Sequence, residues 1–159
     1  MKELVELLIE KKKTISTMES CTGGGVANAI TNIEGASEIL KFSAVTYSNE
    51  FKIKMGVSEE VINKYSVYSI ETANEMSKNI SDFTSSDYGV GITGKLNRVD
   101  VNNPFGKDNV VFISIYSKEK DKYYTSSVEA IKSTRKDNKE LVINEIIKLM
   151  NNIIKNELK

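Results

Sequence analysis

The sequence predicts an α/β fold: a three-layer α/β/α sandwich around a mixed, mostly parallel sheet of about five strands. Three observations support this prediction. Helical and strand periodicities alternate along most of the chain, and a glycine-rich turn at 23–25 follows a strand-like segment and precedes a helix-like one. The apolar run at 110–116 (VVFISIY) is continuous enough to lie inside a sheet. Helices are therefore expected on both faces of a central sheet.

The first elements follow from residue periodicity. Apolar positions in residues 1–8 repeat at helical spacing, and residues 14–18 (TISTM) have the composition of a strand. Apolar residues at helical spacing in 24–34 indicate that the glycines open a helix, and 42–48 (FSAVTYS) predicts a second strand. The glycines thus lie at a strand-to-helix turn.

Serine caps predict the next group of helices. Ser58 and Ser69 are residue types that favour helix N-termini, and they predict helices over 58–65 and from 69 to about 83. A further short helix is expected over 49–55.

The remaining elements are three strands and a long helix. Residues 88–93 and 110–116 are apolar and of strand length, and a polar segment joins the second of them to 123–128. This arrangement predicts an antiparallel hairpin. Thr134 is expected to open the last helix, which has a regular apolar stripe.

Composition argues against several classes of function. The 159 residues suit one domain spanning 1–159, and 22 basic residues balance 22 acidic ones, so no net field favours nucleic acid or an anionic membrane. A single cysteine and the lack of an N-terminal apolar run of signal or membrane length predict a cytoplasmic protein. No histidine is present, which removes the usual zinc ligands and the histidine-dependent catalytic groups. We expect neither a metal nor a cofactor.

Three segments with reactive side chains follow predicted strands. They are MESCTGGG at 18–25, TYSNEFK at 46–52 and GITGK at 91–95. Ligands in sheets of this kind bind at the carboxyl ends of the strands. We therefore expect the three segments to converge on one edge of the sheet.

The first segment offers two nucleophiles. Ser20 is placed to attack a carbonyl whose oxygen the turn amides hold, and Cys21 is the rival, although a lone cysteine is commonly a small buried residue. The amides of 22–25 suit a phosphate or an oxyanion, or the glycines simply make the turn tight. Glu19 is either an acid or base, or a charge that stabilises the helix N-terminus.

The second segment supplies a base. A lysine deprotonates a serine when burial or a nearby cation lowers its pKa toward neutrality, and Lys52 is the candidate. Tyr47 would relay the proton or hold the ammonium. The alternative is a solvated helix lysine.

Two strings resemble a known family. ESCTGG (19–24) and VTYSNEFK (45–52) are similar to the signature stretches of the CinA C-terminal domain family, the nicotinamide-nucleotide amidohydrolases, in the same order and at this separation. Residues 55–62, 66–76 and 133–138 resemble further family segments. The resemblance implies a homodimer that deamidates nicotinamide mononucleotide to nicotinic acid mononucleotide and ammonia without metal.

The resemblance also implies roles for particular residues. Ser20 would be the nucleophile, with Tyr47 and Lys52 completing the catalytic site. Apart from the resemblance, we expect the pyridine nucleotide to be held by the following residues: Glu19, Cys21, Thr22, Gly23, Gly24, Asn49, Thr93, Gly94, Lys95, Arg98 and Arg135.

One loop departs from the family pattern. Where the family has TGIAGP and a glycine-rich loop, residues 93–109 read TGKLNRVDVNNPFGKDN. We hypothesise that Lys95 and Arg98 replace backbone amides in gripping a phosphate; the alternative is that both are solvated. A second function remains open, that of a catalytically silent homologue that binds a nucleotide or a partner protein. GVGITG (89–94) matches G-x-G-x-x-G, but a polar loop follows it and not a helix, so it fails as a nucleotide-binding motif.

Overall fold

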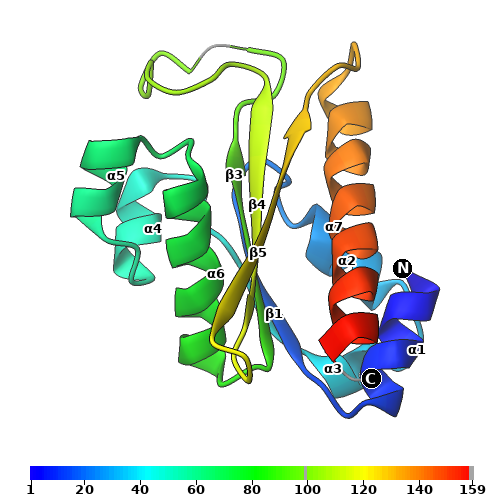
Figure 1. Cartoon of the computed structure of the whole chain (residues 1–159). Coiled ribbons are helices and arrows are strands. Elements are labelled where there is room, and N and C mark those ends of the chain that lie inside the picture. The colour runs from blue at the N-terminus through cyan, green and yellow to red at the C-terminus, as the bar shows by residue number, and fades with distance from the viewer. Residues whose placement is uncertain (99, 158–159) are drawn as a thin grey trace.

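The computed structural model describes residues 1–98 and 100–157. It contains a five-stranded sheet between two layers of helices (Figure 1). In chain order the elements are α1 (Lys2–Glu10), β1 (Ile15–Glu19), α2 (Gly25–Thr31), α3 (Ala36–Ile39), β2 (Leu40–Val45), α4 (Asn49–Lys54), α5 (Glu59–Tyr65), α6 (Ile70–Thr84), β3 (Tyr88–Gly94), β4 (Val110–Ser117), β5 (Lys122–Glu129) and α7 (Arg135–Glu157).

The strand order confirms the predicted mixed sheet. The order is β2-β1-β3-β4-β5; β1 pairs in parallel with β2 and β3, and β4 pairs antiparallel with β3 and β5. Four strands therefore run in one direction and only β4 runs against them. The predicted hairpin is formed by β4 and β5, with Val110 opposite Glu129 and Ser117 opposite Lys122.

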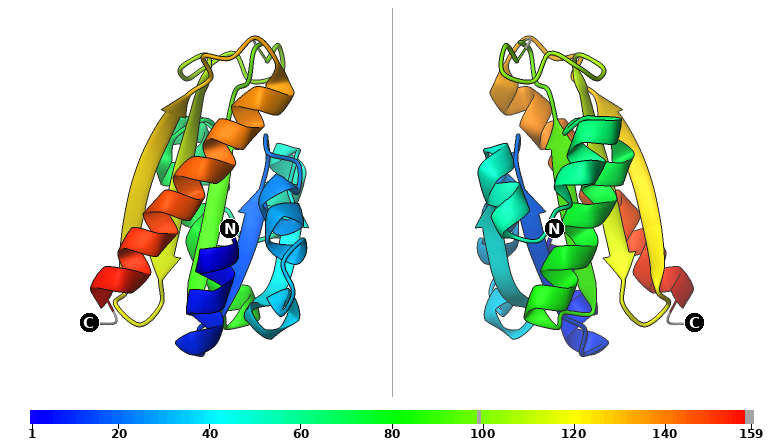
Figure 2. Two further views of the ribbon diagram at one scale, coloured as in Figure 1. Left: turned by 90° about the vertical axis from the view of Figure 1, so that its right-hand side faces the viewer. Right: turned by 90° about the vertical axis from the view of Figure 1, so that its left-hand side faces the viewer.

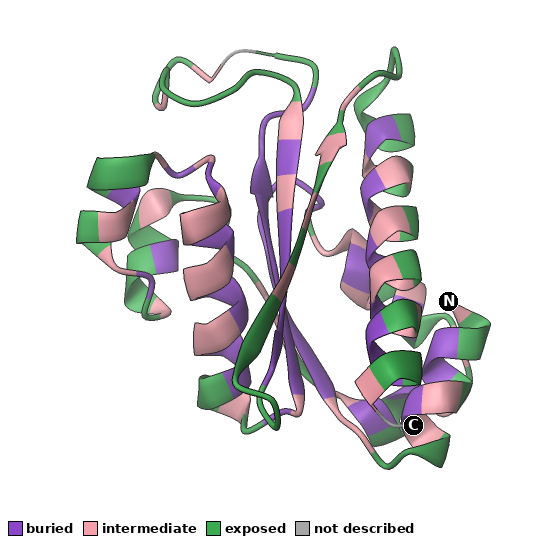
Figure 3. Ribbon diagram, viewed as in Figure 1, coloured by how far each residue is buried: buried purple, intermediate pink, exposed green. Residues whose placement is uncertain are grey.

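The two helical layers cover the sheet differently (Figures 2 and 3). Helices α1, α2 and α7 lie on one face, over a large apolar core that includes Val90, Ile92 and Ile113. Helices α4, α5 and α6 lie on the other face, where a smaller apolar cluster includes Met18, Met76 and Ile80.

Small residues bring α6 close to the sheet. A Cβ added to Gly89 would lie 1.9 Å from the Ser77 carbonyl oxygen, and one added to Gly91 would lie 2.2 Å from the Ala73 carbonyl oxygen. The hydroxyls of Ser77 and Ser114 are 2.9 Å apart across the same contact. The glycines of GVGITG therefore serve helix–sheet packing.

The second strand begins and ends earlier than the predicted 42–48. The short helix α3, which periodicity did not reveal, leads directly into β2, and β2 ends at Val45. Residues 46–48 are thereby released into a loop, in which the Ser48 hydroxyl accepts a hydrogen bond from the Phe51 amide and caps α4. This loop reaches the site described below.

The predicted serine and threonine caps are confirmed. Ser58 accepts from the Val61 amide, Ser69 from the Thr72 amide, and Thr134 from the Asp137 amide. No helix in residues 1–98 and 100–157 is long and apolar enough to cross a membrane.

Candidate active site

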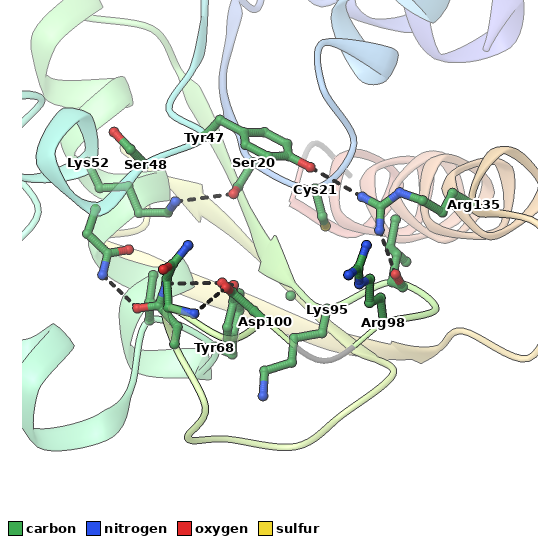
Figure 4. Close-up of a pocket in the computed structure, with 16 residues that line it drawn as sticks. Ser20, Cys21, Tyr47, Ser48, Lys52, Tyr68, Lys95, Arg98, Asp100 and Arg135 are labelled. Carbon is green, nitrogen blue, oxygen red and sulfur yellow. Dashed lines mark hydrogen bonds between the residues drawn. The ribbon is translucent and has the colours of Figure 1, made fainter.

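A pocket of about 520 Å³ lies beyond the carboxyl ends of β1 and β3 (Figure 4). All three segments singled out in the sequence reach it, and α7 adds Arg135. The predicted convergence at one edge of the sheet is therefore confirmed. The lining residues are Ser20, Cys21, Tyr47, Ser48, Asn49, Lys52, Val67, Tyr68, Gly94, Lys95, Leu96, Arg98, Asp100, Asn102, Asn103 and Arg135.

Ser20 and Lys52 meet on one side of this pocket. Ser20 follows the last residue of β1 and is 6% exposed, and Lys52 projects from α4. The Lys52 Nζ donates a hydrogen bond of 3.1 Å to the Ser20 Oγ and one of 2.7 Å to the Thr46 carbonyl oxygen. Two residues 32 positions apart in the chain thus form a direct polar contact.

Burial changes the protonation of Lys52. The residue is 2% exposed, and within the described residues its ammonium forms no ion pair with a carboxylate. Desolvation disfavours the charged form and lowers the pKa of Lys52 to about 8, although the charges of Cys21 and Asp100 act in the opposite direction. A neutral amine is therefore well populated slightly above neutral pH.

Cys21 has the opposite electrostatic character. It is buried, and desolvation raises the pKa of its thiol to about 12 despite the nearby cations Lys52, Arg135 and Lys139. The thiol is therefore protonated where Lys52 becomes neutral. Of the two nucleophiles suggested by the sequence, Ser20 is the one that contacts a potential base.

The carboxylate of Glu19, the last residue of β1, forms hydrogen bonds with the N-terminus of α2 and does not line the pocket. It is fully buried and accepts hydrogen bonds from the Thr22 hydroxyl at 2.6 Å and from the amides of Val26 and Ala27 at 3.1 and 2.9 Å. It thus satisfies two amides in the first turn of α2, which matches the alternative in which Glu19 is a charge that stabilises the helix N-terminus. Neither Glu19 nor Thr22 lines the pocket, so we assign both to holding the turn.

The glycines shape the turn between β1 and α2. Gly23 and Gly24 have φ angles of +61° and +87°, in the left-handed region that favours glycine, and neither lines the pocket. The Gly23 amide donates to the Ser20 carbonyl oxygen. The Gly25 amide donates to the Thr22 carbonyl oxygen, and of residues 21–24 only Cys21 lines the pocket.

Tyr47 lies at the mouth of the pocket, away from the position predicted for a relay. It is 63% exposed, and its hydroxyl accepts a hydrogen bond from Arg135 Nη2 at 3.2 Å. The group that holds the Lys52 ammonium is instead the Thr46 carbonyl oxygen. Sequence reasoning missed this group because every residue carries a backbone carbonyl.

Lys95 is engaged within its own loop. It is 3% exposed, and its Nζ donates to Asp108 Oδ1 at 3.0 Å and to the Pro104 carbonyl oxygen at 3.5 Å. Figure 4 shows its side chain directed away from Ser20. We therefore assign Lys95 to tethering the 95–108 loop, in place of both alternatives given by the sequence.

Arg98 and Arg135 provide the cations on the side of the pocket opposite Lys52 (Figure 4). Arg135, the first residue of α7, donates through Nη1 to the Leu96 carbonyl oxygen, which fixes its guanidinium beside the loop. Arg98 is exposed on the loop itself. One helical turn after Arg135, Lys139 lies over the glycine turn, where a Cβ added to Gly23 would be 3.4 Å from its Nζ.

A polar network that the sequence did not predict lines the loop side. Asn49 donates to Asn103 at 2.8 Å, Asn103 donates to Asp100 at 3.0 Å, and the Tyr68 hydroxyl donates to the same Asp100 oxygen. The Asn102 amide donates to the other carboxylate oxygen at 2.9 Å. The loop thus places a hydrogen-bonded carboxylate, Asp100, in the lining of the pocket.

The end of β3 supports this wall through packing. The Thr93 hydroxyl donates to the Val67 carbonyl oxygen at 2.8 Å and is fully buried, outside the pocket lining. A Cβ added to Gly94 would lie 2.5 Å from the Val110 carbonyl oxygen, so β4 requires glycine there. Of these two predicted substrate-binding residues, only Gly94 reaches the pocket.

Fold and site together define a class: an α/β sandwich with a buried serine–lysine pair at the carboxyl edge of its sheet. The described residues contain no group of three or more His, Cys, Asp and Glu side chains placed to hold a metal ion. The family follows from comparison with known proteins. The sequence model of the CinA C-terminal domain family matches residues 1–154, and the chain belongs to this family.

Sequence relatives of this chain are CinA-like proteins. A CinA-like protein of Endomicrobium trichonymphae is 39% identical over 148 residues, which cover 91% of this chain and 33% of the relative. A CinA-like protein of Flavobacterium psychrophilum is 43% identical over 115 residues, covering 70% and 27%. The chain thus spans about a third or less of the length of these relatives.

The fold matches crystal structures of the CinA superfamily. The protein from Klebsiella pneumoniae 700603 has a TM-score of 0.88 and 18% identity, with 98% of this chain and 95% of that chain covered. The protein from Escherichia coli has a TM-score of 0.85 and 22% identity, with 96% and 87% covered. These likenesses establish the fold.

Proposed function

We propose that this pocket is the active site of an amidohydrolase that converts nicotinamide mononucleotide and water to nicotinic acid mononucleotide and ammonia. The observation that carries the proposal is the hydrogen bond between Ser20 and Lys52, a buried lysine that has neutral hydrogen-bond partners and a lowered pKa. Membership of the CinA family, to which the sequence resemblance attaches this activity, supports the choice of substrate.

The first half of the reaction forms an acyl-enzyme. One N–H of neutral Lys52 stays on the Thr46 carbonyl oxygen, and the lone pair of Nζ takes the proton of the Ser20 hydroxyl. The Oγ attacks the carboxamide carbon, a C–O bond forms, and the C=O π electrons move onto oxygen. The backbone amide of Cys21, the turn residue that lines the pocket beside Ser20, is the proposed donor for that oxyanion.

The second half releases both products. The Lys52 ammonium returns its proton to the amide nitrogen as the C–N bond breaks, so ammonia leaves and an ester on Ser20 remains. Neutral Lys52 then takes a proton from water, which attacks the ester carbonyl. The C–Oγ bond breaks, Ser20 regains its proton, and nicotinic acid mononucleotide departs.

Binding uses the cationic side of the pocket. Arg135 and Arg98 are the groups for the phosphate, because both line the pocket and an arginine guanidinium matches phosphate geometry. The exposed ring of Tyr47 provides an aromatic surface at the entrance. Lys95 does not bind the phosphate in this proposal, because its ammonium is already paired with Asp108.

Ammonia release from nicotinamide mononucleotide tests the proposal. The wild-type protein should release ammonia, Ser20→Ala should lose about 10³-fold or more in rate, and Cys21→Ala should keep most of it. Circular dichroism checks that each variant is folded. Full activity of the serine variant would contradict the nucleophile, and no turnover by the wild-type protein would favour the silent, nucleotide-binding or partner-binding homologue.

A further inference from the structure

Charges of opposite sign occupy different sides of the pocket. Asp100 lies on the loop side in the hydrogen-bonded network of Tyr68 and Asn103, and Figure 4 shows Arg98 and Arg135 farther from Lys52. The proposed substrate has the same pattern. Its pyridinium ring carries a positive charge, its phosphate is negative, and a ribose separates the two.

The Asp100 carboxylate is held firmly and stays ionised. Hydrogen bonds from the Tyr68 hydroxyl, the Asn103 side chain and the Asn102 amide hold the pKa of Asp100 below its ordinary value. All three donors are neutral. Within residues 1–98 and 100–157, no lysine or arginine forms an ion pair with this carboxylate, so it enters the pocket as an uncompensated charge.

The cations nearest to this wall do not neutralise Asp100. Lys95 lies over the Tyr68 ring, 5.2 Å from its centroid, but its ammonium pairs with Asp108. Lys52 feels the Asp100 charge, which favours the ammonium form, whereas the proposed reaction needs the neutral amine. A further positive charge beside Asp100 would offset this effect.

We propose that Asp100 is a specificity-determining residue that recognises the positive charge of an oxidised pyridinium ring. This inference rests on the proposed function and adds the redox and charge state of the substrate to it. The carboxylate attracts the ring cation while Arg135 and Arg98 hold the phosphate, which orients the mononucleotide along the pocket. With the ring bound, the Asp100 charge no longer holds a proton on Lys52 as strongly.

Oxidised and reduced nicotinamide mononucleotide form a matched pair of ligands for a test. The reduced molecule keeps the carboxamide, the ribose and the phosphate, but its ring is neutral. Calorimetric titration of the Ser20→Ala variant measures binding of both without turnover. We expect the oxidised form to bind about tenfold more tightly, because one attractive charge pair in a partly exposed site has this order of effect.

Asp100→Asn in the Ser20→Ala background should reduce the preference to within about twofold, because it removes the charge and keeps the shape. Asp137→Asn is the matched control: it removes the same charge from an exposed position in the first turn of α7, outside the pocket lining, and should keep the preference. Thermal melting checks that all variants are folded.

Three results would overturn the inference: equal binding of the two forms before Asp100 is changed, an unchanged preference in Asp100→Asn, or equal weakening of both forms by that substitution. The last would show that Asp100 contacts the ribose or the carboxamide. If neither form binds and the wild-type protein releases no ammonia, the proposed function fails, and the role of Asp100 fails with it.

Discussion

Two walls of one pocket each contain a buried lysine, and the two lysines have opposite surroundings. On the catalytic wall (Ser20, Cys21 and Lys52), the ammonium of Lys52 faces a hydroxyl and a carbonyl oxygen. On the loop wall (Lys95, Asp100 and Asn103), the ammonium of Lys95 faces the Asp108 carboxylate. Burial without a counter-charge favours a neutral base, whereas burial with one produces a structural tether.

The same substitution at both lysines gives the largest contrast. Lys52→Met should lower ammonia release by about 10³-fold, because it removes the base, and should stabilise the fold by about 3 kcal/mol at neutral pH, because the pKa of Lys52 is lowered from 10.5 to about 8. A lysine whose pKa is lowered on folding costs stability wherever it is charged in both states. Lys95→Met should instead destabilise the protein, because it breaks the tether to Asp108 and Pro104.

The pH dependence of this stabilisation follows from the sign of the shift. Below about pH 8, Lys52 is protonated in both the folded and the unfolded chain, so the free energy of unfolding of Lys52→Met exceeds that of the wild-type protein by the full amount. Between pH 8 and 10.5 the unfolded wild-type chain binds more protons than the folded one, so the wild-type protein becomes more stable as the pH rises. The difference in stability between Lys52→Met and wild type therefore becomes smaller. Thermal melts across this range measure it; a Lys52→Met variant less stable than wild type at pH 7 would contradict the account.

A smaller effect is expected at the cationic side of the pocket. Arg135→Ala should raise the KM for the mononucleotide about tenfold and leave the KM for the phosphate-free riboside within about twofold, more clearly at low salt. Lys136→Ala, the next residue on α7 and outside the pocket lining, is the control and should change neither. Equal increases for both substrates would mean that Arg135 only supports the loop through Leu96.

The sequence predicted the parts of the molecule that depend on local pattern. Periodicity placed the sheet and most helices, and Ser58, Ser69 and Thr134 are helix caps as predicted. The rule that ligands bind at the carboxyl ends of strands predicted that Ser20 and Lys52 lie at one edge of the sheet, where they form a hydrogen bond. The predictions of caps and helices succeed because helix caps and amphipathic stripes are determined by residues close together in the sequence.

The sequence could not predict where long polar side chains point. Glu19 caps α2, Tyr47 meets Arg135 across 88 positions, and Lys95 pairs with Asp108, because each partner is supplied by tertiary structure. Asp100 was missed for the same reason: its three donors come together only when the 95–108 loop folds over Tyr68.

The pH dependence of kcat/KM for nicotinamide mononucleotide tests the central claim, that neutral Lys52 activates Ser20. Because kcat/KM reports the ionisation of the free enzyme, we expect the rate constant to rise with pH, to reach half of its maximum near pH 8 and to level off above it. A rate that is constant from about pH 6 to about pH 10, or one that rises only through the acidic range of carboxylates, would contradict a lysine base.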